Sequence, residues 1–269
     1  MDRLAFKMDF GLTQIFKYIK WKLAYKKADE GNLHSWGTCV FCGPQGSGKT
    51  LSAVQYVEKV FDFSPRAILV TNVDLKKYPV NAFMDEDGIL RYYEDLDQVI
   101  THDYLIEHCY DEDFVKPVIA YEGLDMLTTL KNGKDGVIYL IDEFHLELNS
   151  LESKNIPIEI MTEISQQRKQ RVHIVGTSQV FMRLAKPLRE QIFNVVICKN
   201  YFGLLQVNKM CLGEEIKENS DGKITAEIKA RSIWLHQPKY YEEYDTFAKM
   251  KRYTTLWKNS KGGLNTIYG

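Results

Sequence analysis

The sequence has almost no net charge, few cysteines and prolines, and no long apolar run. Its 35 basic residues nearly balance 36 acidic ones, and of 269 residues only 7 are proline and 5 are cysteine. A chain without a stretch of about 18 apolar residues is not expected to cross a membrane as a helix. An odd, small number of cysteines argues against a disulfide-stapled secreted domain and predicts reduced thiols in the cytoplasm. The 17 glycines exclude a collagen-like chain, and 12% aromatic residues exclude a disordered one.

Charge is nevertheless unevenly distributed. Residues 1–27 carry seven basic against two acidic residues, residues 85–113 carry eleven acidic residues against Arg91, and residues 166–190 carry six basic residues against one. Such blocks bear on partners or are solvated faces. The first block lacks the apolar region of a secretory signal. We expect a basic aromatic segment at residues 1–35, a core at 36–210, and an appended hairpin and helix at 211–269.

Short apolar runs alternate with longer segments of helical period. The runs expected to form buried parallel strands are Trp36–Cys42, Ala67–Thr71, Val137–Ile141, Val172–Thr177 and Phe193–Cys198. The segments expected to form helices are Lys49–Val60, Pro157–Gln170, Pro187–Gln191 and Tyr240–Tyr253. This alternation predicts an α/β fold with a parallel, doubly wound sheet and helices on both faces. Residues 223–235 follow an Asp-Gly turn signal and are expected to form an antiparallel hairpin at the sheet edge.

The most specific motif, GPQGSGKT, lies directly after the first apolar run and directly before a helical segment. It matches the P-loop NTPase pattern G-x-x-x-x-G-K-[ST] in full, in the strand–loop–helix context that the pattern requires. Backbone N–H groups of such a loop converge on a phosphate, and the helix N-terminus adds positive potential. The residues expected to bind ATP are Gly43, Pro44, Gln45, Gly46, Ser47, Gly48, Lys49 and Thr50. Lys49 is expected to reach the β and γ phosphates, and the Thr50 hydroxyl to ligate Mg²⁺.

Two carboxylates, Asp142 and Glu143, end the apolar run that starts at Val137. Parallel strands end at one side of a sheet, where ligands of open α/β sheets bind. We therefore expect Asp142 to hold Mg²⁺ beside the phosphate loop. Glu143 is expected to act as the general base that polarises the attacking water. A plain acidic turn is the alternative.

Polar residues also end the run that starts at Val172, and Gln179 among them is the candidate for sensing the γ-phosphate or orienting the water. On either side of it in sequence lie Arg168, Arg171 and Arg189. Each is a candidate catalytic arginine that reaches a neighbouring subunit's phosphates, or this chain's own. The alternative for each is a solvated helix end, where cations are favoured by the helix dipole.

Cysteine and histidine give weaker signals. Cys39 and Cys42 form a lone C-x-x-C in the run before the phosphate loop. Without a second pair at zinc-binding spacing, they are interpreted as small apolar side chains. His145 follows Glu143 by two residues, and a packing or surface role is expected for it.

Taken together, GPQGSGKT, the strand ending in Asp142–Glu143, the arginine-containing helix and RKQRVHIVGTSQ resemble the FtsK–HerA branch of P-loop motor ATPases. Within it the Zot-like (zonular occludens toxin-like) proteins of phages and the viral packaging ATPases are most similar. The segment EEYDTFAKM also resembles a Tyr-Asp-Thr stretch of that group, whereas Ser178 interrupts its Thr-Gln pair. The resemblance spans about residues 36–250.

The resemblance implies ATP hydrolysis by a homo-oligomeric ring that translocates or packages viral DNA. Such a ring would bind the DNA phosphate backbone without reading sequence. It would work in the host cytoplasm, with a portal, capsid or membrane assembly partner.

Two other functions are kept as alternatives. The first is a membrane-docked phage assembly or secretion ATPase, in which the basic aromatic N-terminal segment would lie on the membrane surface. Zot-like assembly proteins of filamentous phages have a membrane span after the ATPase core, and the lack of an apolar run here favours the packaging motor instead. The second is a small-molecule kinase or nucleotide switch. Kinases must exclude water, so a water-activating Glu143 argues against that class.

Overall fold

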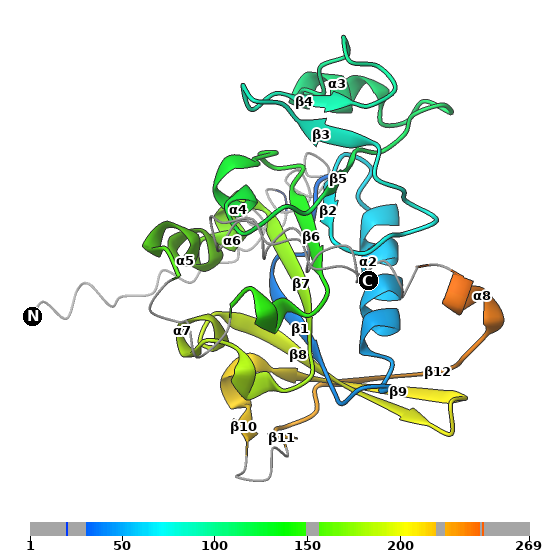
Figure 1. Cartoon of the computed structure of the whole chain (residues 1–269), viewed down its shortest axis with the longest axis vertical. Helices are drawn as coiled ribbons and strands as arrows, with labels where there is room; N and C mark the ends of the chain where they lie inside the picture. Colours follow the sequence, from blue (N-terminus) through cyan, green and yellow to red (C-terminus); the bar gives the residue numbers. More distant parts are fainter. Residues whose placement is uncertain (1–19, 21–30, 149–155, 219–223, 243, 245–269) are drawn as a thin grey trace, which may run out of the picture.

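The structure, a computed structural model, describes residues 20, 31–148, 156–218, 224–242 and 244. Ten strands of this part of the chain form one sheet (Figure 1). In chain order they are β1 (Gly37–Cys42), β2 (Ile68–Thr71), β3 (Ala82–Met84), β4 (Leu90–Tyr92), β5 (Val118–Ala120), β6 (Val137–Ile141), β7 (Val172–Ser178), β8 (Ile192–Tyr201), β9 (Leu205–Leu212) and β12 (Ala230–Leu235). Across the sheet they follow the order β12-β9-β8-β1-β7-β6-β2-β5-β3-β4.

Seven neighbouring strands, from β8 to β3 across the sheet, run parallel. They include all five strands that the apolar runs predict, so this prediction is confirmed. Every residue of β1, β6 and β7 is buried. A strand covered on both faces needs apolar residues at successive positions, which explains the unbroken runs. Strands β4, β9 and β12 are antiparallel to their neighbours.

Helices cover both faces of the parallel strands, as expected (Figure 1). One face is covered by α2 (Lys49–Asp62), whose Val54, Val57 and Phe61 join a buried apolar cluster. The other face is covered by α4 (Met126–Thr129), α5 (Ile158–Ser165) and α7 (Lys186–Arg189). The single helix expected at 157–170 is instead two helices, because the chain leaves helical geometry at Gln166 between α5 and α6 (Gln167–Gln170). The 3₁₀ helices are η2 (Phe144–Leu146), η4 (Phe181–Arg183) and η5 (Gly213–Glu215).

The C-terminal strands pair differently from the prediction. Residues 223–235 do not form one hairpin: β11 (Ile224–Thr225) pairs with β10 (Lys217–Glu218) in a separate small sheet, and β12 pairs with β9. The hairpin at the edge of the main sheet is β8–β9. The boundary expected between residues 210 and 211 falls inside β9, so β9 and β12 continue the core sheet. Helix α8 (Pro238–Glu242) is the described part of the helix expected at 240–253.

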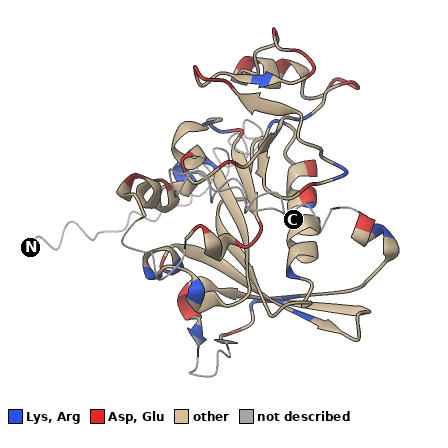
Figure 2. Ribbon diagram, viewed as in Figure 1, with Lys and Arg blue, Asp and Glu red and all other residues tan. Residues whose placement is uncertain are grey.

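The acidic block folds into a lobe at the opposite sheet edge from β12. This acidic lobe, residues 82–114, contains β3, β4 and α3 (His102–His108). Figure 2 shows its carboxylates gathered at the outside of the lobe. Leu90, Ile100 and Leu105 are buried beneath them. Thr101 caps α3 by accepting the backbone N–H of Tyr104 at 3.1 Å.

Some predictions fall outside the described residues. Most of the basic aromatic segment predicted for residues 1–35 does, as does most of EEYDTFAKM. What was expected of these segments stays a prediction. Within the part of the chain that the structure describes, no helix combines the length and apolarity needed to cross a membrane.

Candidate functional site

The expected phosphate loop, residues 43–48, connects the end of β1 to the start of α2. Gly46 and Gly48 have φ angles of 76° and 77°, a left-handed conformation that glycine adopts without strain. A Cβ on Gly43 would lie 2.4 Å from the Ser47 hydroxyl, so close packing also requires glycine there. No described side chain caps the N-terminus of α2. Backbone N–H groups of the loop and of the first helical turn are therefore available to an anion.

Lys49 and Thr50 begin α2, directly after the loop. Lys49 is only 7% exposed and lies within electrostatic range of His145. The Thr50 hydroxyl donates a hydrogen bond of 2.9 Å to an Asp142 carboxylate oxygen. This contact joins the phosphate-loop motif to the end of β6, two parts of the sequence that were predicted to meet.

Asp142 is held in place by the ends of the two strands that flank β6. β7 lies between β1 and β6, so the carboxylate is one strand further from the loop than expected. The Thr177 hydroxyl, near the end of β7, donates to Asp142 at 2.6 Å and accepts the backbone N–H of Glu143 at 2.9 Å. On the other side the Asn72 side chain, just after β2, makes two hydrogen bonds with the Asp142 backbone, of 2.7 and 3.2 Å. Thr177 therefore bridges the gap that β7 opens.

Glu143 follows Asp142 in a left-handed backbone conformation, with φ of 53°. Such conformations are uncommon outside glycine and cluster at functional sites. The Nδ1 atom of His145 lies 3.3 Å from a Glu143 carboxylate oxygen. Burial lowers the pKa of His145 against the opposing charge of Glu143, so the ring is neutral at pH 7. The packing or surface role expected for His145 missed this contact, for which the two-residue spacing was the available signal.

The oxygens of Thr50 and Asp142 suit a magnesium ion. Mg²⁺ prefers oxygen ligands and commonly takes one or two from the protein, with water and substrate phosphates as the others. A hydroxyl and a carboxylate oxygen 2.9 Å apart, beside a phosphate loop, offer such a pair. The residues present therefore fit the expected ion.

The residues that end β7 divide between two uses. Thr177 and Ser178 are fully buried, and the Ser178 hydroxyl donates to the Val180 carbonyl at 2.9 Å. Gln179 follows directly and is partly exposed. Because β7 lies between β1 and β6, Gln179 lies between the phosphate loop and the end of β6, where its expected role requires it.

The structure does not bring Arg168 or Arg171 to the phosphate loop. Both precede β7 and lie at the amino end of the parallel strands, about 20 Å from the carboxyl end. Arg171 donates to the Leu33 carbonyl at 2.8 Å, and Arg168 stacks over the ring of Trp36 at 5.4 Å. This placement excludes a role of either arginine toward the chain's own nucleotide. A role toward a neighbouring subunit's nucleotide stays a prediction.

The other arginines of this basic block lie between β7 and β8. Arg189, at the end of α7, contacts Met182 and precedes the start of β8. Arg183, on η4, lies close enough to His145 to lower the pKa of that ring. Among the arginines of this block it is therefore Arg183, which the sequence analysis did not select, that lies near Glu143.

All five cysteines are buried thiols, as the composition predicts. Cys39 and Cys42 pack in β1. Burial raises the pKa of Cys39 to about 12, so the thiol stays protonated. Their role is packing, in agreement with the interpretation of the lone C-x-x-C.

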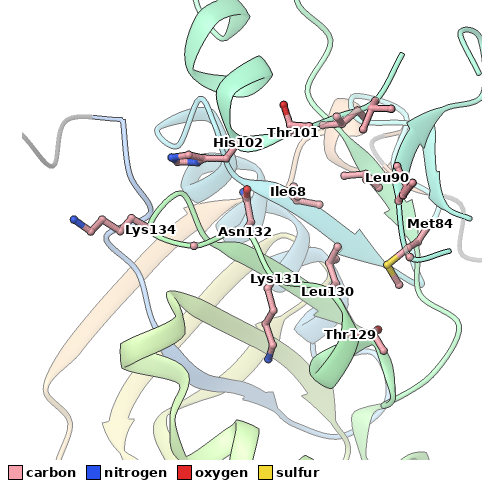
Figure 3. A pocket seen from close by; sticks show the side chains of 15 residues that line it. Ile68, Met84, Leu90, Thr101, His102, Thr129, Leu130, Lys131, Asn132 and Lys134 are labelled. Atoms are coloured by element: carbon pink, nitrogen blue, oxygen red, sulfur yellow. The ribbon is translucent and has the colours of Figure 1, made fainter. Parts of the chain in front are cut away.

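A cavity of about 640 Å³ lies at the opposite end of the sheet. Figure 3 shows side chains of the acidic lobe, such as Leu90, and of the segment before β6, such as Leu130 and Asn132, around it. Ile68, the first residue of β2, also lines it. The cavity is therefore at the amino end of the parallel strands, away from the phosphate loop.

No known protein-family model matches the sequence, and no curated protein matches it. Solved structures do show likeness. The N-terminal domain of zonular occludens toxin from Neisseria meningitidis is 20% identical, with a TM-score of 0.47, over 78% of this chain and 98% of that one. The genome packaging NTPase B204 from Sulfolobus turreted icosahedral virus 2 is 11% identical, with a TM-score of 0.43, over 75% of this chain and 96% of that one.

A third solved structure, also an ATPase domain, is 12% identical, with a TM-score of 0.43, over 88% of this chain and 99% of that one. Identities of 20% or less and TM-scores below 0.5 do not establish a shared family. The fold of this chain follows from its own strand order and phosphate loop. It is a P-loop NTPase fold.

Proposed function

We propose that this chain is an ATP-hydrolysing, Mg²⁺-dependent motor that translocates or packages viral or phage DNA. The observation that carries the ATPase part is the 2.9 Å hydrogen bond between Thr50 and Asp142. It joins a phosphate loop to a strand-end carboxylate at the carboxyl end of a parallel sheet, where ligands of this architecture bind. The DNA part rests on the resemblance of the sequence motifs to packaging motors.

In this proposal the loop N–H groups and Lys49 bind the ATP phosphates. Mg²⁺, held by Thr50 and Asp142, would neutralise charge on the phosphate oxygens. Glu143 takes a proton from the attacking water as general base. Gln179, between the loop and the strand end, orients that water or senses the γ-phosphate.

The proposed active form is a homo-oligomeric ring, in the cytoplasm of the host, that grips the DNA phosphate backbone. Arg168, Arg171 or Arg189 would stabilise transition-state charge on a neighbour's nucleotide. The amino-end location of Arg168 and Arg171 supports a neighbour as their target. A portal, capsid or membrane assembly factor is the proposed larger partner.

The test is the ATPase rate measured against protein concentration, with and without duplex DNA. A ring motor should gain specific activity with concentration and gain more with DNA. A concentration-independent rate that DNA leaves unchanged would overturn the motor. A phosphorylated small-molecule product would point to a kinase instead, and flotation with anionic liposomes to a membrane-docked ATPase.

A mixing experiment tests the arginines. An inactive Lys49→Ala chain mixed with an inactive arginine→Ala chain should recover activity, since some interfaces then contain one intact half of each site. Removal of a true catalytic arginine should cost about 1,000-fold or more in rate. Full activity of all three single arginine variants would remove them from the mechanism.

A further inference from the structure

Strand β9 has its polar side chains inside and its apolar ones outside. Gln206 and Asn208 are buried, whereas Leu205 and Val207 between and beside them are partly exposed. A strand with one solvent-facing side ordinarily shows the reverse alternation. Buried amides are tolerated only when they are hydrogen-bonded, so their partners explain the inversion.

The partners of these amides are the phosphate loop and helix α2. The Gln206 Nε2 atom donates to the Ser47 carbonyl at 2.9 Å and to Asn208 Oδ1 at 2.8 Å. Asn208 in turn donates to the Ser52 hydroxyl, in the first turn of α2, at 3.0 Å. One edge strand thus holds both the loop and the helix that follows it.

The contact between Gln206 and the loop leaves no spare room. A Cβ on Gly48 would lie 2.2 Å from the Gln206 Oε1 atom. Gly48 therefore has to be glycine for two reasons, its φ of 77° and this close approach. A carbonyl only accepts hydrogen bonds, so Ser47 fixes the Gln206 amide with its nitrogen toward the loop.

His236 holds the other end of the amide. Its Nε2 atom lies 3.1 Å from Gln206 Oε1, and its Nδ1 atom lies 2.5 Å from the Tyr241 hydroxyl. With Nε2 protonated, the ring donates to Gln206, and Nδ1 accepts from Tyr241. Trp234 stacks on the ring at 4.8 Å between centroids. These contacts keep the amide from rotating away from Ser47.

We propose that Gln206 is a positioning residue for the phosphate loop, with His236 fixing its amide. In a trans peptide the carbonyl and the next N–H point in opposite directions. When Gln206 draws the Ser47 carbonyl toward β9, the Gly48 N–H is turned away from β9, into the hollow of the loop. Gln206 does not touch the nucleotide itself. The inference rests on the proposed ATP site.

The test compares Gln206→Met with Tyr56→Phe. Methionine keeps the length and volume of the glutamine but cannot donate to Ser47. The Tyr56→Phe control also removes a partly buried hydrogen bond of α2, that between Tyr56 and His173 at 3.0 Å, but one remote from the loop. Gln206→Met should weaken ATP binding and raise KM by about 10-fold, with kcat within about 2-fold of wild type. Tyr56→Phe should lower the thermal midpoint at unchanged ATP affinity.

His236→Ala provides a second variant, because His236 is only partly buried and its loss spares the core. It should raise the Kd for ATP by about 3-fold through the freed amide. The inference is overturned if Gln206→Met, or His236→Ala where Gln206→Met does not fold, binds ATP as tightly as Tyr56→Phe. Absence of ATP binding by the wild-type chain would instead overturn the proposed function, and the inference with it.

Discussion

The two ends of the parallel strands carry the same residue types but use them differently. At the amino end, Asp135 is fully buried and pairs with Arg66 at 2.9 Å and His102 at 2.7 Å. At the carboxyl end, Asp142 is also buried, but its hydroxyl partners include Thr50 of the phosphate-loop motif. A carboxylate paired with fixed cations ties elements together. A carboxylate tied to a ligand-binding motif is placed to act on the ligand, so the partner, not the burial, distinguishes the two roles.

The largest expected effect comes from removing a carboxylate charge at the carboxyl end. Glu143→Gln should retain ATP binding and lose about 1,000-fold in hydrolysis rate, because the amide keeps the shape but not the base. The same change at the amino end, Glu163→Gln, removes only an ion pair with Lys131 at 2.6 Å and should leave the rate unchanged. Phosphate release and ATP-analogue binding measure both. Hydrolysis by Glu143→Gln at the parent rate would mean that another residue is the base.

Two lysines allow a second matched pair. Lys49→Ala should weaken ATP binding by more than about 100-fold, because the charge that reaches the phosphates is lost. Lys131→Ala removes hydrogen bonds to Leu127, Glu163 and Gln170 at the amino end and should not alter ATP affinity. Titration with a fluorescent ATP analogue gives both constants. Near wild-type affinity in a folded Lys49→Ala chain would contradict the assignment of the phosphate loop.

The two aspartates should separate stability from binding. Asp135→Asn should lower the free energy of unfolding by about 3 kcal/mol, because it leaves Arg66 without its buried counter-charge, while ATP binding persists. Asp142→Asn should instead reduce the Mg²⁺-dependent part of ATP binding. Denaturant unfolding and ATP titrations with and without EDTA measure the two effects. Loss of Mg²⁺ dependence in Asp135→Asn would contradict the distinction.

The smallest effect is expected from the histidines. His145→Ala should lower kcat by about 10-fold with ATP affinity unchanged, because the Glu143 carboxylate loses the contact that orients it. His145→Asn, which keeps a side-chain N–H, should recover part of the rate. His102→Ala at the amino end should leave kcat as it was. Equal rates in His145→Ala and wild type would return His145 to a packing role.

The strand and loop positions of this molecule were predictable because they follow short-range rules. An unbroken apolar run has to be buried on both faces, and the glycines of GPQGSGKT fit one loop geometry. The positions of Arg168 and Arg171 were not predictable in this way. They are close to Gln179 in sequence, but the intervening strand β7 is extended and carries the chain from one end of the sheet to the other.

Gln206 was missed for a different reason. Its strand, LQVNKMCL, alternates as a half-buried strand should, and the alternation indicates that the amides face water. The structure reverses this because the amides find partners in a loop 159 residues away. The acidic lobe was missed likewise, since its few apolar residues, such as Leu90 and Leu105, are spread too thinly to give a period. Long-range partners decide both cases, and a single sequence does not encode them locally.

The buried cysteines have a practical consequence for measuring how this molecule opens. Thiol reagents attack the thiolate, and burial raises the pKa of Cys39 and of Cys198 to about 12. Cys39 is in the strand that leads into the phosphate loop, and Cys198 is in the neighbouring β8. Alkylation in the native state should therefore report the rate at which these central strands separate. A ligand that seats on the loop should slow that labelling, which makes the chain's own sulfur atoms a reporter of occupancy that needs no added dye.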